Sequence, residues 1–421
     1  MKIAIIGGGV SGLVAAHLLQ RTGSHDVTLF EAGEQLGGHT HTVDVEDGGG
    51  ARLAVDTGFI VHNDRNYPCF QRLLEQLGVA TQPAPMSFGV ADAVGDFEYN
   101  GASPNGLYAK RAHLVTPWFQ RMVADLVRFN REARELLAAD AGAWDPSLRE
   151  YLAARRYSVA FVQRLIVPQA SAVWSADPEQ LWRFPARFLV EFFDNHGMLG
   201  FRDRPQWRTV SGGSRRYVDA IAARLGERRV RVATPVEAVS RHADRVELTP
   251  RGGAPERFDH VVIAAHADQA LRLLSDPRER ELELLGAFPY QRNDVVLHTD
   301  RGLLPRRRRA WASWNYHLTE RPPGRPTVTY HLNRLQALRG AEREYLVTLN
   351  RSDDVRAEHV IERFAYDHPV YTRAGVAAQA RWEELDGIDR TSFCGAYWGW
   401  GFHEDGVRSA LRACERFGGR L

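Results

Sequence analysis

Apolar residues recur along the chain with two different spacings, and each spacing predicts a different element. Short apolar runs bounded by glycine or polar residues are typical of buried strands, whereas apolar residues three and four positions apart are typical of helices. Strands are predicted at 3–6, 26–30, 42–46, 51–56, 230–233, 236–241, 258–264, 289–298, 327–331 and 392–395, and those at 230–233 and 236–241 are expected to pair with each other. Helices are predicted at 13–20, 67–77, 114–139, 217–225 and from about 406, with further helices within 147–193.

The order of these elements predicts two domains, one of them interrupted twice by the other. The 421 residues exceed a typical single domain. Strands followed by helices occur at the start, in the middle and at the end of the chain, and the stretches between them are rich in helices and aromatic residues. We therefore predict a fold that is α/β plus α+β. The first domain is assigned to residues 1–62, 205–275 and 380–421, and the second to 63–204 and 276–379.

The first predicted strand and helix are joined by the motif Gly-x-Gly-x-x-Gly. Gly7 would allow a tight turn, Gly9 would let backbone approach a pyrophosphate, and Gly12 would let the helix pack closely on the strand. The next strand ends at Glu31, whose carboxylate suits the ribose hydroxyls of an adenine dinucleotide. A glycine turn without a ligand is the alternative. The strand, helix and acid at these positions favour a Rossmann-type dinucleotide-binding domain, interleaved with a helix-rich substrate domain.

Two further glycine motifs favour FAD over NAD as the dinucleotide. Gly37 and Gly38 follow Glu31 closely and would let backbone approach the pyrophosphate from its other side. Residues 399–407, Gly-Trp-Gly-Phe-His-Glu-Asp-Gly-Val, lead into the last predicted helix. Backbone N–H groups at such a helix start can face the flavin atoms on which negative charge grows during reduction. Ordinary glycine loops are the alternative for both motifs.

Composition and charge narrow the function classes. The 54 basic and 52 acidic residues give a net charge of +2, so no nucleic-acid partner is predicted. Lys2 and Lys110 are the only lysines. Three separated cysteines without Cys-x-x-Cys favour a reducing, cytoplasmic location, and no metal is predicted because no metal-ligand spacing is visible. No apolar run reaches about 18 residues, so no membrane-spanning helix is predicted.

With these motifs in place, the sequence resembles the flavoprotein superfamily of amine oxidases, protoporphyrinogen oxidases and carotenoid desaturases. Within it, the chain closely resembles bacterial FAD/NAD-binding proteins related to the N-terminal flavin domain of plant cyclopropane fatty acid synthases. The segments that carry the resemblance include EAGEQLGGHTHTV, VDTGFIVHN, RPQWRTVSGGSRRYV, FDHVVIAAHADQAL, LHTDRGLLPRRRRAWASWNY and FCGAYWGWGFHEDGVRSAL. They span nearly the whole chain.

The resemblance implies roles for the matching positions. The ADP half of FAD would be bound by Gly7, Gly9, Ser11, Gly12, Glu31, Gly37, Gly38 and His39, with the backbone of Val236 at the adenine. Thr57, Gly58 and Phe59 would lie near the isoalloxazine ring, and Asp405, Gly406 and Val407 would close over its pyrimidine side. The FAD would be non-covalent, because no cysteine matches the attachment position of related enzymes.

The resemblance also implies an FAD-dependent oxidoreductase, for which His403, Glu404 and His196 are the candidate catalytic residues. A hydrogen-bonded structural role is the alternative for the histidines. Many amine oxidases carry a lysine that holds a water at flavin N5, and residues 291–294 contain none at the corresponding place. This absence makes amine oxidation less favoured without excluding it. The resemblance to fatty-acid-modifying enzymes and the many aromatic residues of the second domain make dehydrogenation or desaturation of an acyl chain of a lipid the leading hypothesis. The alternatives are oxidation of an amine or polyene, and a non-catalytic flavoprotein partner of a lipid methyltransferase.

An arginine run, Arg306 to Arg309, precedes Trp311 and Trp314 and has two interpretations. The first is a solvated charge run, which usually serves solubility. The second is a peripheral membrane contact, in which arginines meet lipid phosphates and tryptophans lie at the interface. Such a contact would bring a hydrophobic or acyl-lipid substrate directly to a cytoplasmic protein.

Overall fold

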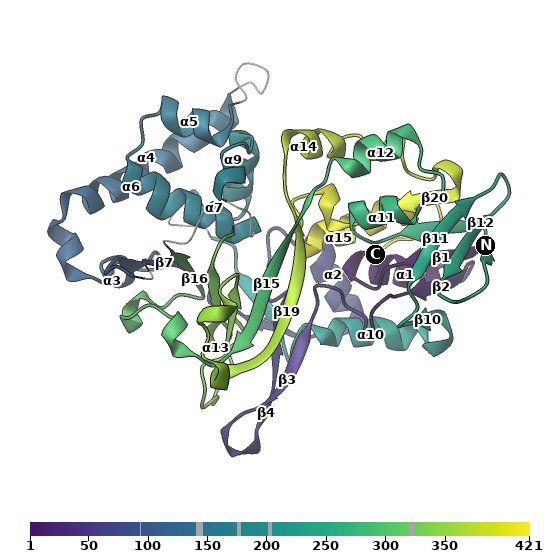
Figure 1. The fold of residues 1–421 in the computed structure, drawn as a ribbon, viewed down its shortest axis with the longest axis horizontal. Helices are drawn as coiled ribbons and strands as arrows, with labels where there is room; N and C mark the ends of the chain where they lie inside the picture. Colours follow the sequence, from purple (N-terminus) through teal and green to yellow (C-terminus); the bar gives the residue numbers. More distant parts are fainter. Residues whose placement is uncertain (93, 140–145, 175–177, 201–203, 320–324) are drawn as a thin grey trace.

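The first strand of the chain forms the centre of a five-stranded parallel sheet. The computed structural model of the protein describes residues 1–421 except 93, 140–145, 175–177, 201–203 and 320–324. In the order β10-β2-β1-β14-β20, the strands of this sheet are Val230–Arg231, Asp26–Phe30, Lys2–Ile6, His260–Ile263 and Thr391–Phe393. Regions far apart in the sequence therefore build one sheet, which lies on the right in Figure 1.

Both faces of the parallel sheet are covered, because successive side chains of a strand point to opposite sides. Ile3 and Ile5 of β1 share a core with α1 (Val10–Arg21), α2 (Pro68–Leu77), α10 (Arg215–Leu225) and α15 (His403–Glu415). Ala4 and Ile6 share a second core with helices α11 (Ala267–Leu273) and α12 (Glu279–Gly286) and with a small antiparallel sheet. That sheet consists of β11 (Val236–Arg241), β12 (Val246–Pro250) and β13 (Glu256–Phe258).

A seven-stranded sheet forms the base of the second half of the molecule. In the order β19-β15-β18-β17-β16-β7-β8, its strands are Val360–Pro369, Tyr290–His298, Leu346–Leu349, Val328–His331, Trp314–Leu318, Phe88–Asp92 and Glu98–Asn100. Neighbouring strands are antiparallel except β16 and β7, which are parallel. The long strands β15 and β19 run between the two halves of the molecule (Figure 1).

Helices gather over and beside one end of this sheet, on the left in Figure 1. They are α3 (Pro104–Leu107), α4 (Pro117–Ala138), α5 (Leu148–Ala154), α6 (Val159–Phe161), α7 (Val167–Trp174), α8 (Pro178–Leu181) and α9 (Ala186–Asn195). The remaining strands and α-helices are the hairpin β3–β4 (Thr42–Glu46 and Arg52–Asp56), the sheet β5-β9-β6 (His62–Asn63, Trp207–Val210 and Thr81–Pro83), α13 (Leu332–Leu335) and α14 (Arg373–Gln379).

The predicted fold class is confirmed: a parallel sheet with helices is joined to a second, mixed half that carries most of the other helices. The five parallel strands all come from the segments assigned to the first domain, and the seven strands of the other sheet all come from 63–204 and 276–379. The domain boundaries themselves stay a prediction. None of the helices in the described ranges is long and apolar enough to cross a membrane.

One predicted pairing is wrong. Residues 230–233 and 236–241 were expected to form a strand pair, but β10 joins the parallel sheet beside β2 and β11 pairs with β12. The physical reason is Ala233 between them, which has a positive φ of 48° and turns the chain out of the first sheet. Its N–H donates to the carbonyl of Gly33 at 2.7 Å, which anchors this turn beside the end of β2.

Candidate functional site

A cavity of about 1180 Å³ lies between the two halves and is lined by residues of both. From the first half it is lined by the turn after β1, the end of β2, residues 37–39 and 57–61, and the start of α15. From the second half it is lined by side chains of the helices and of the seven-stranded sheet. The glycine motifs found in the sequence therefore share one cavity with the helix-rich region.

The three glycines of the first motif have separate structural reasons. Gly7 has a φ of +107°, and a Cβ there would lie 2.6 Å from the carbonyl oxygen of Ala264. A Cβ on Gly12 would overlap the carbonyl oxygen of Gly7, so only glycine lets α1 approach β1. Gly9 has no atom within 4 Å of its Cβ position and lines the cavity. This pattern fits a group that approaches the backbone at Gly9, at the positive N-terminal end of α1.

Glu31 lies at the end of β2 and fixes the loops on either side of it. Its carboxylate accepts hydrogen bonds of 2.6 Å from the backbone N–H groups of Gly8 and Gly33. The side chain lines the cavity beside Val236, which comes from the start of β11. The carboxylate thus already has two donors, and a ribose would meet an acceptor that is held in place.

The second glycine pair brings two loops against the first motif. Gly37 and Gly9 form a β-bridge, and the N–H of Gly37 donates to Gly8 at 2.8 Å. A Cβ on Gly58 would overlap the carbonyl oxygen of His39, whereas Phe59 donates its N–H to that oxygen at 2.7 Å. Residues 57–59 therefore reach the cavity because position 58 is a glycine.

His403 joins these loops at the start of α15. Its ring stacks on Phe59, with centroids 3.5 Å apart, and its Nε2 lies 2.9 Å from the hydroxyl of Thr40 and 3.1 Å from that of Tyr217. Burial lowers the pKa of His403 to about 3, so the ring is neutral at ordinary pH. His403 lines the cavity, and its contacts indicate that it positions the loops at residues 40 and 59.

The neighbouring residues of α15 lie behind the cavity wall. Asp405 accepts a hydrogen bond of 3.0 Å from the N–H of Phe402 and so caps the helix. A Cβ on Gly406 would lie 2.7 Å from Val10 Cγ1, so glycine lets α15 pack on the start of α1. Val407 is fully buried in the core of the first half. Their expected contact with the flavin stays a prediction.

Glu404 lies elsewhere and does not line the cavity. Its carboxylate accepts hydrogen bonds from the backbone N–H groups of Cys69 at 3.2 Å and of Phe70 at 2.9 Å, at the start of α2. A carboxylate at this end of a helix satisfies donors that lack a partner within the helix. The geometry therefore favours a structural role over the catalytic role predicted for Glu404.

His196 lies in the cavity wall of the second half. Its Nδ1 lies 2.9 Å from the carbonyl oxygen of Phe192, so this nitrogen carries the proton and Nε2 is left as the basic nitrogen. Burial lowers the pKa of His196 to about 4. Around it, the wall is mainly aromatic and aliphatic. The apolar wall includes Met86, Phe88, Tyr99, Leu107, Leu126, Leu165, Val173, Trp174, Phe192, Met198, Trp207, Trp314, Tyr330, Tyr371, Trp400 and Phe402.

A cluster of imidazole and phenol rings in the cavity wall was missed as a site in the sequence. His39 lies 5.2 Å from the ring of His368, 5.1 Å from that of Tyr366 and 6.0 Å from that of His266. Burial, together with the other histidines, keeps the pKa of His39 well below its usual range. His266 stacks on Tyr290. The sequence did contain one signal for this cluster. Tyr366 and His368 are two positions apart on a strand, so both side chains point to the same face of it.

Neither lysine and none of the cysteines lines the cavity. Lys2 lies over the ring of Phe258, and Lys110 pairs with Asp96 at 2.9 Å. Cys394 and Cys414 are buried in the first half, which is consistent with the prediction of non-covalent FAD.

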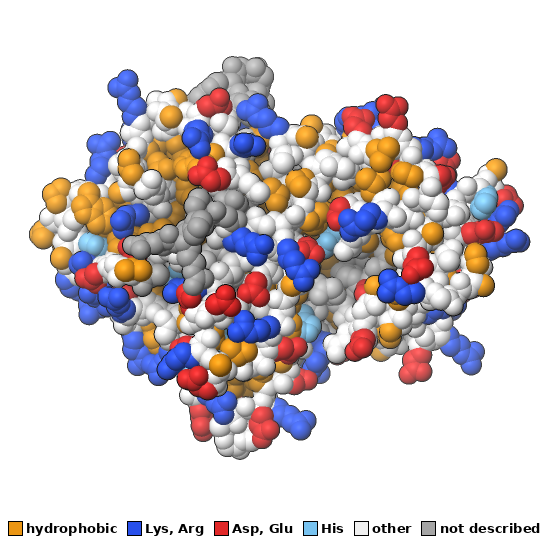
Figure 2. Space-filling view, in the orientation of Figure 1, with side chains coloured by type: hydrophobic (Ala, Val, Ile, Leu, Met, Phe, Trp, Pro, Cys, Tyr) orange, Lys and Arg blue, Asp and Glu red, His pale blue; other side chains and the backbone are white. Residues whose placement is uncertain are grey.

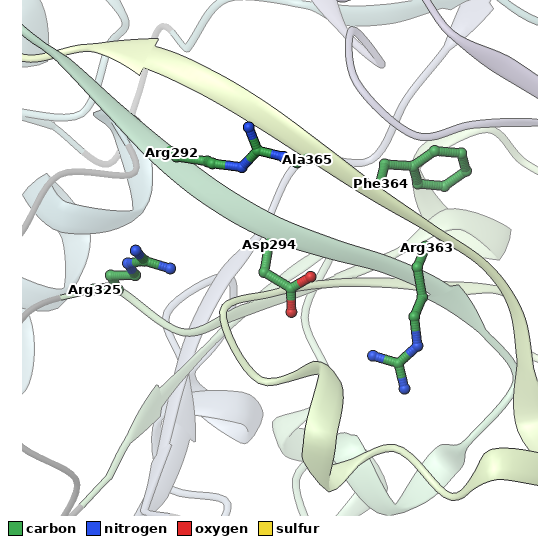
Figure 3. A pocket seen from close by; sticks show the side chains of 6 residues that line it. All are labelled: Arg292, Asp294, Arg325, Arg363, Phe364 and Ala365. Carbon is green, nitrogen blue, oxygen red and sulfur yellow. The ribbon is translucent and has the colours of Figure 1, made fainter.

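A second pocket, of about 420 Å³, lies on the ribbon of β15 and β19. Figure 3 shows Asp294 between Arg325 and Arg363, with Arg292 further along β15. Among the described residues no carboxylate forms an ion pair with any of these three arginines. The pocket contains none of the predicted site residues.

The tryptophans after the arginine run are not at the surface, which corrects one part of the predicted membrane contact. Trp311 is 7% exposed, and its indole N–H donates to the carbonyl of Pro305 at 2.7 Å. Trp314 lines the main cavity and meets the ring of Tyr330 edge-on. Trp311 packs against Leu304 and Leu346, and Trp314 packs against the large core of the second half.

Comparison with known proteins agrees with this geometry. The family model of flavin-containing amine oxidoreductases matches residues 10–417. The (S)-6-hydroxynicotine oxidase of Paenarthrobacter nicotinovorans is 23% identical over 69% of this chain and 64% of its own length. The tryptophan 2-monooxygenase of Allorhizobium ampelinum is 32% identical over 43% of this chain and 24% of its own length. The chain thus spans less than two thirds of either relative.

A solved structure shows the same fold. The cyclohexylamine oxidase of Brevibacterium oxydans IH-35A superimposes with a TM-score of 0.69 at 19% identity, covering 99% of this chain and 98% of its own. The narrower resemblance to the flavin domain of plant cyclopropane fatty acid synthases finds no support in these relatives and stays a prediction. FAD as the cofactor and oxidoreductase chemistry are confirmed at the level of the family. The chain belongs to the family of flavin-containing amine oxidoreductases.

Proposed function

We propose that this protein removes hydride from a hydrophobic substrate, and that this substrate carries the acyl chain of a lipid. The observation that carries the proposal is the continuous cavity, which joins the glycine turn of the first half to a largely apolar wall in the second. Pockets that are lined by apolar side chains with a few polar groups bind ligands of matching character. When bound, FAD supplies the hydride acceptor.

The residues around the turn after β1 fit the cofactor. The open Cβ position of Gly9 and the N-terminus of α1 suit a pyrophosphate, and Glu31 offers a fixed acceptor for ribose hydroxyls. His403, Phe59 and residues 57–58 would hold the loops beside the ring system. These residues bind and orient the cofactor. Dehydrogenation also releases a proton from the carbon next to the one that loses hydride, and the basic Nε2 of His196 in the cavity wall is the candidate acceptor of that proton.

The apolar wall favours an acyl chain over an amine. The acidic side chains among the lining residues are Glu31, Glu237 and Asp367, and none of them lies on the helices of the second half. A protonated amine would therefore find no carboxylate partner among the aromatic side chains there. The absence of a lysine from the lining points the same way.

An amine or polyene substrate is the second candidate. The curated relatives favour an amine, since they include a hydroxynicotine oxidase and a flavin-containing amine oxidase of Oncorhynchus mykiss. A third candidate is a non-catalytic flavoprotein that assists a lipid methyltransferase.

Anaerobic mixing of the holoprotein with substrates separates the three candidates. Unsaturated and saturated acyl phospholipids, an alkylamine and a carotenoid would be compared by the loss of oxidised-flavin absorbance. Reduction by acyl lipids alone supports the proposal. Faster reduction by the amine or the polyene overturns it in favour of the second candidate, and no reduction by any of them favours the third.

A further inference from the structure

Exposed apolar side chains gather at one end of the molecule. Four large hydrophobic residues there are well exposed: Val94 at 65%, Leu114 at 53%, Val115 at 83% and Trp118 at 41%. They come from the turn between β7 and β8 and from the segment that leads from α3 into α4. Figure 2 shows hydrophobic side chains at the left end of the molecule, where Figure 1 places these elements. Such a patch usually marks an interaction site.

Contacts between the two segments make them one surface. The rings of Trp118 and Phe97 lie 5.8 Å apart. The guanidinium of Arg164 lies 4.6 Å from the centre of the Phe97 ring and 5.3 Å from that of Trp118. Lys110, four residues before Leu114, pairs with Asp96 in the turn at 2.9 Å. These contacts hold the β7–β8 turn against the start of α4 and the segment that precedes it.

The arginine run borders the same surface. Arg307 pairs with Asp96 at 2.7 Å and with Glu98 at 2.8 Å, which places the run beside the β7–β8 turn. The carbonyl oxygen of Arg309 lies 3.3 Å from the Cβ position of Gly106 in α3. The run and the apolar segment thus flank one turn.

The charge of this border is strongly positive. Asp96 and Glu98 are already neutralised by Lys110 and Arg307, which leaves Asp92 as the other carboxylate of the turn. In the described part of the chain, no ion pair is formed by four exposed arginines nearby. These four are Arg111, Arg306, Arg308 and Arg309.

We propose that this surface binds an anionic lipid bilayer. The docking tip consists of Val94, Leu114, Val115, Trp118, Arg111, Arg306, Arg308 and Arg309. Unpaired arginines gain attraction from anionic headgroups, and apolar side chains beside them enter the interface. An acidic protein could also pair with the arginines. The exposed valines and leucine, however, would bury less apolar surface against such a polar partner than in a bilayer. The membrane contact expected from the sequence is thereby moved from Trp311 and Trp314 to Trp118 and its neighbours.

The elements next to the tip also contribute to the lining of the cavity. The lining includes Gly101, Ala102 and Leu107, which belong to or precede α3, and Leu126 of α4. The elements that would touch the bilayer therefore also wall the cavity. A lipid chain would have a short path from bilayer to cavity, and this last step rests on the proposed function.

Vesicle co-sedimentation of the holoprotein tests the docking tip. Vesicles of phosphatidylcholine with a minor part of phosphatidylglycerol are compared with phosphatidylcholine alone, at low and high salt. Wild type should prefer the anionic vesicles and lose binding as salt is added. Changing Arg306→Ser, Arg308→Ser and Arg309→Ser together should weaken binding on the order of 100-fold, since each arginine near such a surface contributes about fivefold. Arg307 is retained because it is ion-paired within the fold.

Matched controls separate position from total charge. Arg292→Ser, Arg325→Ser and Arg363→Ser, around the pocket of Figure 3, remove the same charge elsewhere and should leave binding near wild type. Leu114→Ser, Val115→Ser and Trp118→Ser should also weaken binding, whereas Val232→Ser, Leu282→Ser and Ile388→Ser, which are similarly exposed, should not. Far-ultraviolet circular dichroism and FAD content establish that each variant folds.

Two results overturn the docking tip. One is equal binding of wild type to both kinds of vesicle at low salt, which would leave an acidic protein as the partner. The other is equal loss of binding in the tip variant and its control. Neither bears on the proposed function, because reduction of the flavin by detergent-dispersed acyl lipid is measured without a bilayer.

Discussion

The imidazole of His403 lies flat on the ring of Phe59, with planes 12° apart and centroids separated by 3.5 Å. These residues come from opposite ends of the chain, and their contact closes the cavity wall between residues 57–59 and the start of α15. Because Nε2 also lies near the hydroxyls of Thr40 and Tyr217, one side chain couples the loops at residues 40 and 59 to helix α10.

Replacing His403 should loosen these loops. His403→Phe keeps the stack but loses both hydrogen bonds, at about 1 kcal/mol each. His403→Ala loses the stack as well and should cost about 3 kcal/mol or more. We expect FAD affinity to fall in the same order, measured by titration of the apoprotein. Equal affinity in wild type and both variants would show that the loops hold their places without His403.

The acid sensitivity of His403 gives the same contact a pH signature. Its pKa is about 3 in the folded protein and near 6.5 when unfolded, so the unfolded chain binds the proton more readily. The stability that the neutral ring contributes is therefore complete above pH 6.5 and is lost as pH falls toward 3. His403→Phe should show a shallower decline in the free energy of unfolding over this range. A decline as steep as that of wild type would contradict the assignment of this loss of stability to His403.

The glycines of the first motif should divide into two kinds. Gly9→Val should leave the fold intact, because no atom lies within 4 Å of the Cβ position and φ is −73°, but it should abolish FAD retention. Gly12→Ala should destabilise the apoprotein itself, because its Cβ would overlap the carbonyl of Gly7. Thermal unfolding of apoprotein and flavin content of purified protein measure the two effects. A Gly9→Val protein that stays yellow would refute the position of the pyrophosphate.

FAD affinity should depend on how many carboxylate oxygens the side chain at position 31 offers. Glu31→Gln keeps one acceptor for the N–H of Gly8 or Gly33, whereas Glu31→Arg keeps none and places a cation there. Hydrogen bonds to a charged group contribute about 1.5–3 kcal/mol, so the arginine variant should bind FAD at least 10-fold more weakly. The glutamine variant should lie between it and wild type. An unchanged dissociation constant in the arginine variant argues against ribose binding by Glu31.

The contribution of Asp405 to stability should be smaller at neutral pH than at acid pH, opposite in direction to that of His403. Burial raises the pKa of Asp405 from 3.8 to about 6, so the folded protein keeps a proton that the unfolded chain releases. Its contribution falls as pH rises from about 4 to about 6, by about 3 kcal/mol in total. Asp405→Asn keeps the acceptor for the N–H of Phe402 and should remove this slope. Urea unfolding of both proteins over that pH range checks it, and parallel curves would contradict it.

Local pattern predicted the elements around the cofactor well. The strands at 26–30 and 42–46 were predicted to the residue, and the stripe Phe70, Leu73, Leu74 and Leu77 is buried on α2 as its helical spacing indicates. These elements obey local rules: a buried strand needs an apolar run, and a helix needs a stripe.

Contacts between segments that are distant in the sequence could not be predicted from local patterns. Glu404 was predicted in the cavity because it follows His403 in the sequence. Adjacent side chains of a helix point about 100° apart, however, and the carboxylate of Glu404 contacts the start of α2 instead. Trp311 was expected at the surface beside four arginines, but it is buried because it packs against Leu304 and against Leu346 of β18. The ring cluster around His39 likewise needs the pairing of β15 with β19, which no local pattern specifies.

The length of the apolar wall can be tested by shortening it. Leu126 of α4, the helix that also carries Trp118, lines the cavity, and its neighbour Val127 is 55% exposed and does not line it. Leu126→Trp should fill the end of the cavity, whereas Val127→Trp adds the same bulk to the solvent side. If the substrate is an acyl chain, the first variant should slow flavin reduction by long-chain lipids about 10-fold or more, and short-chain analogues should be affected less. This follows because a blocked pocket excludes the atoms that would have filled it. The second variant should behave as wild type with both.

Anaerobic stopped-flow rates at matched FAD content measure the difference. An equal effect on long and short chains would mean that the chain does not extend toward α4, and that a compact substrate occupies only the part of the cavity beside His403.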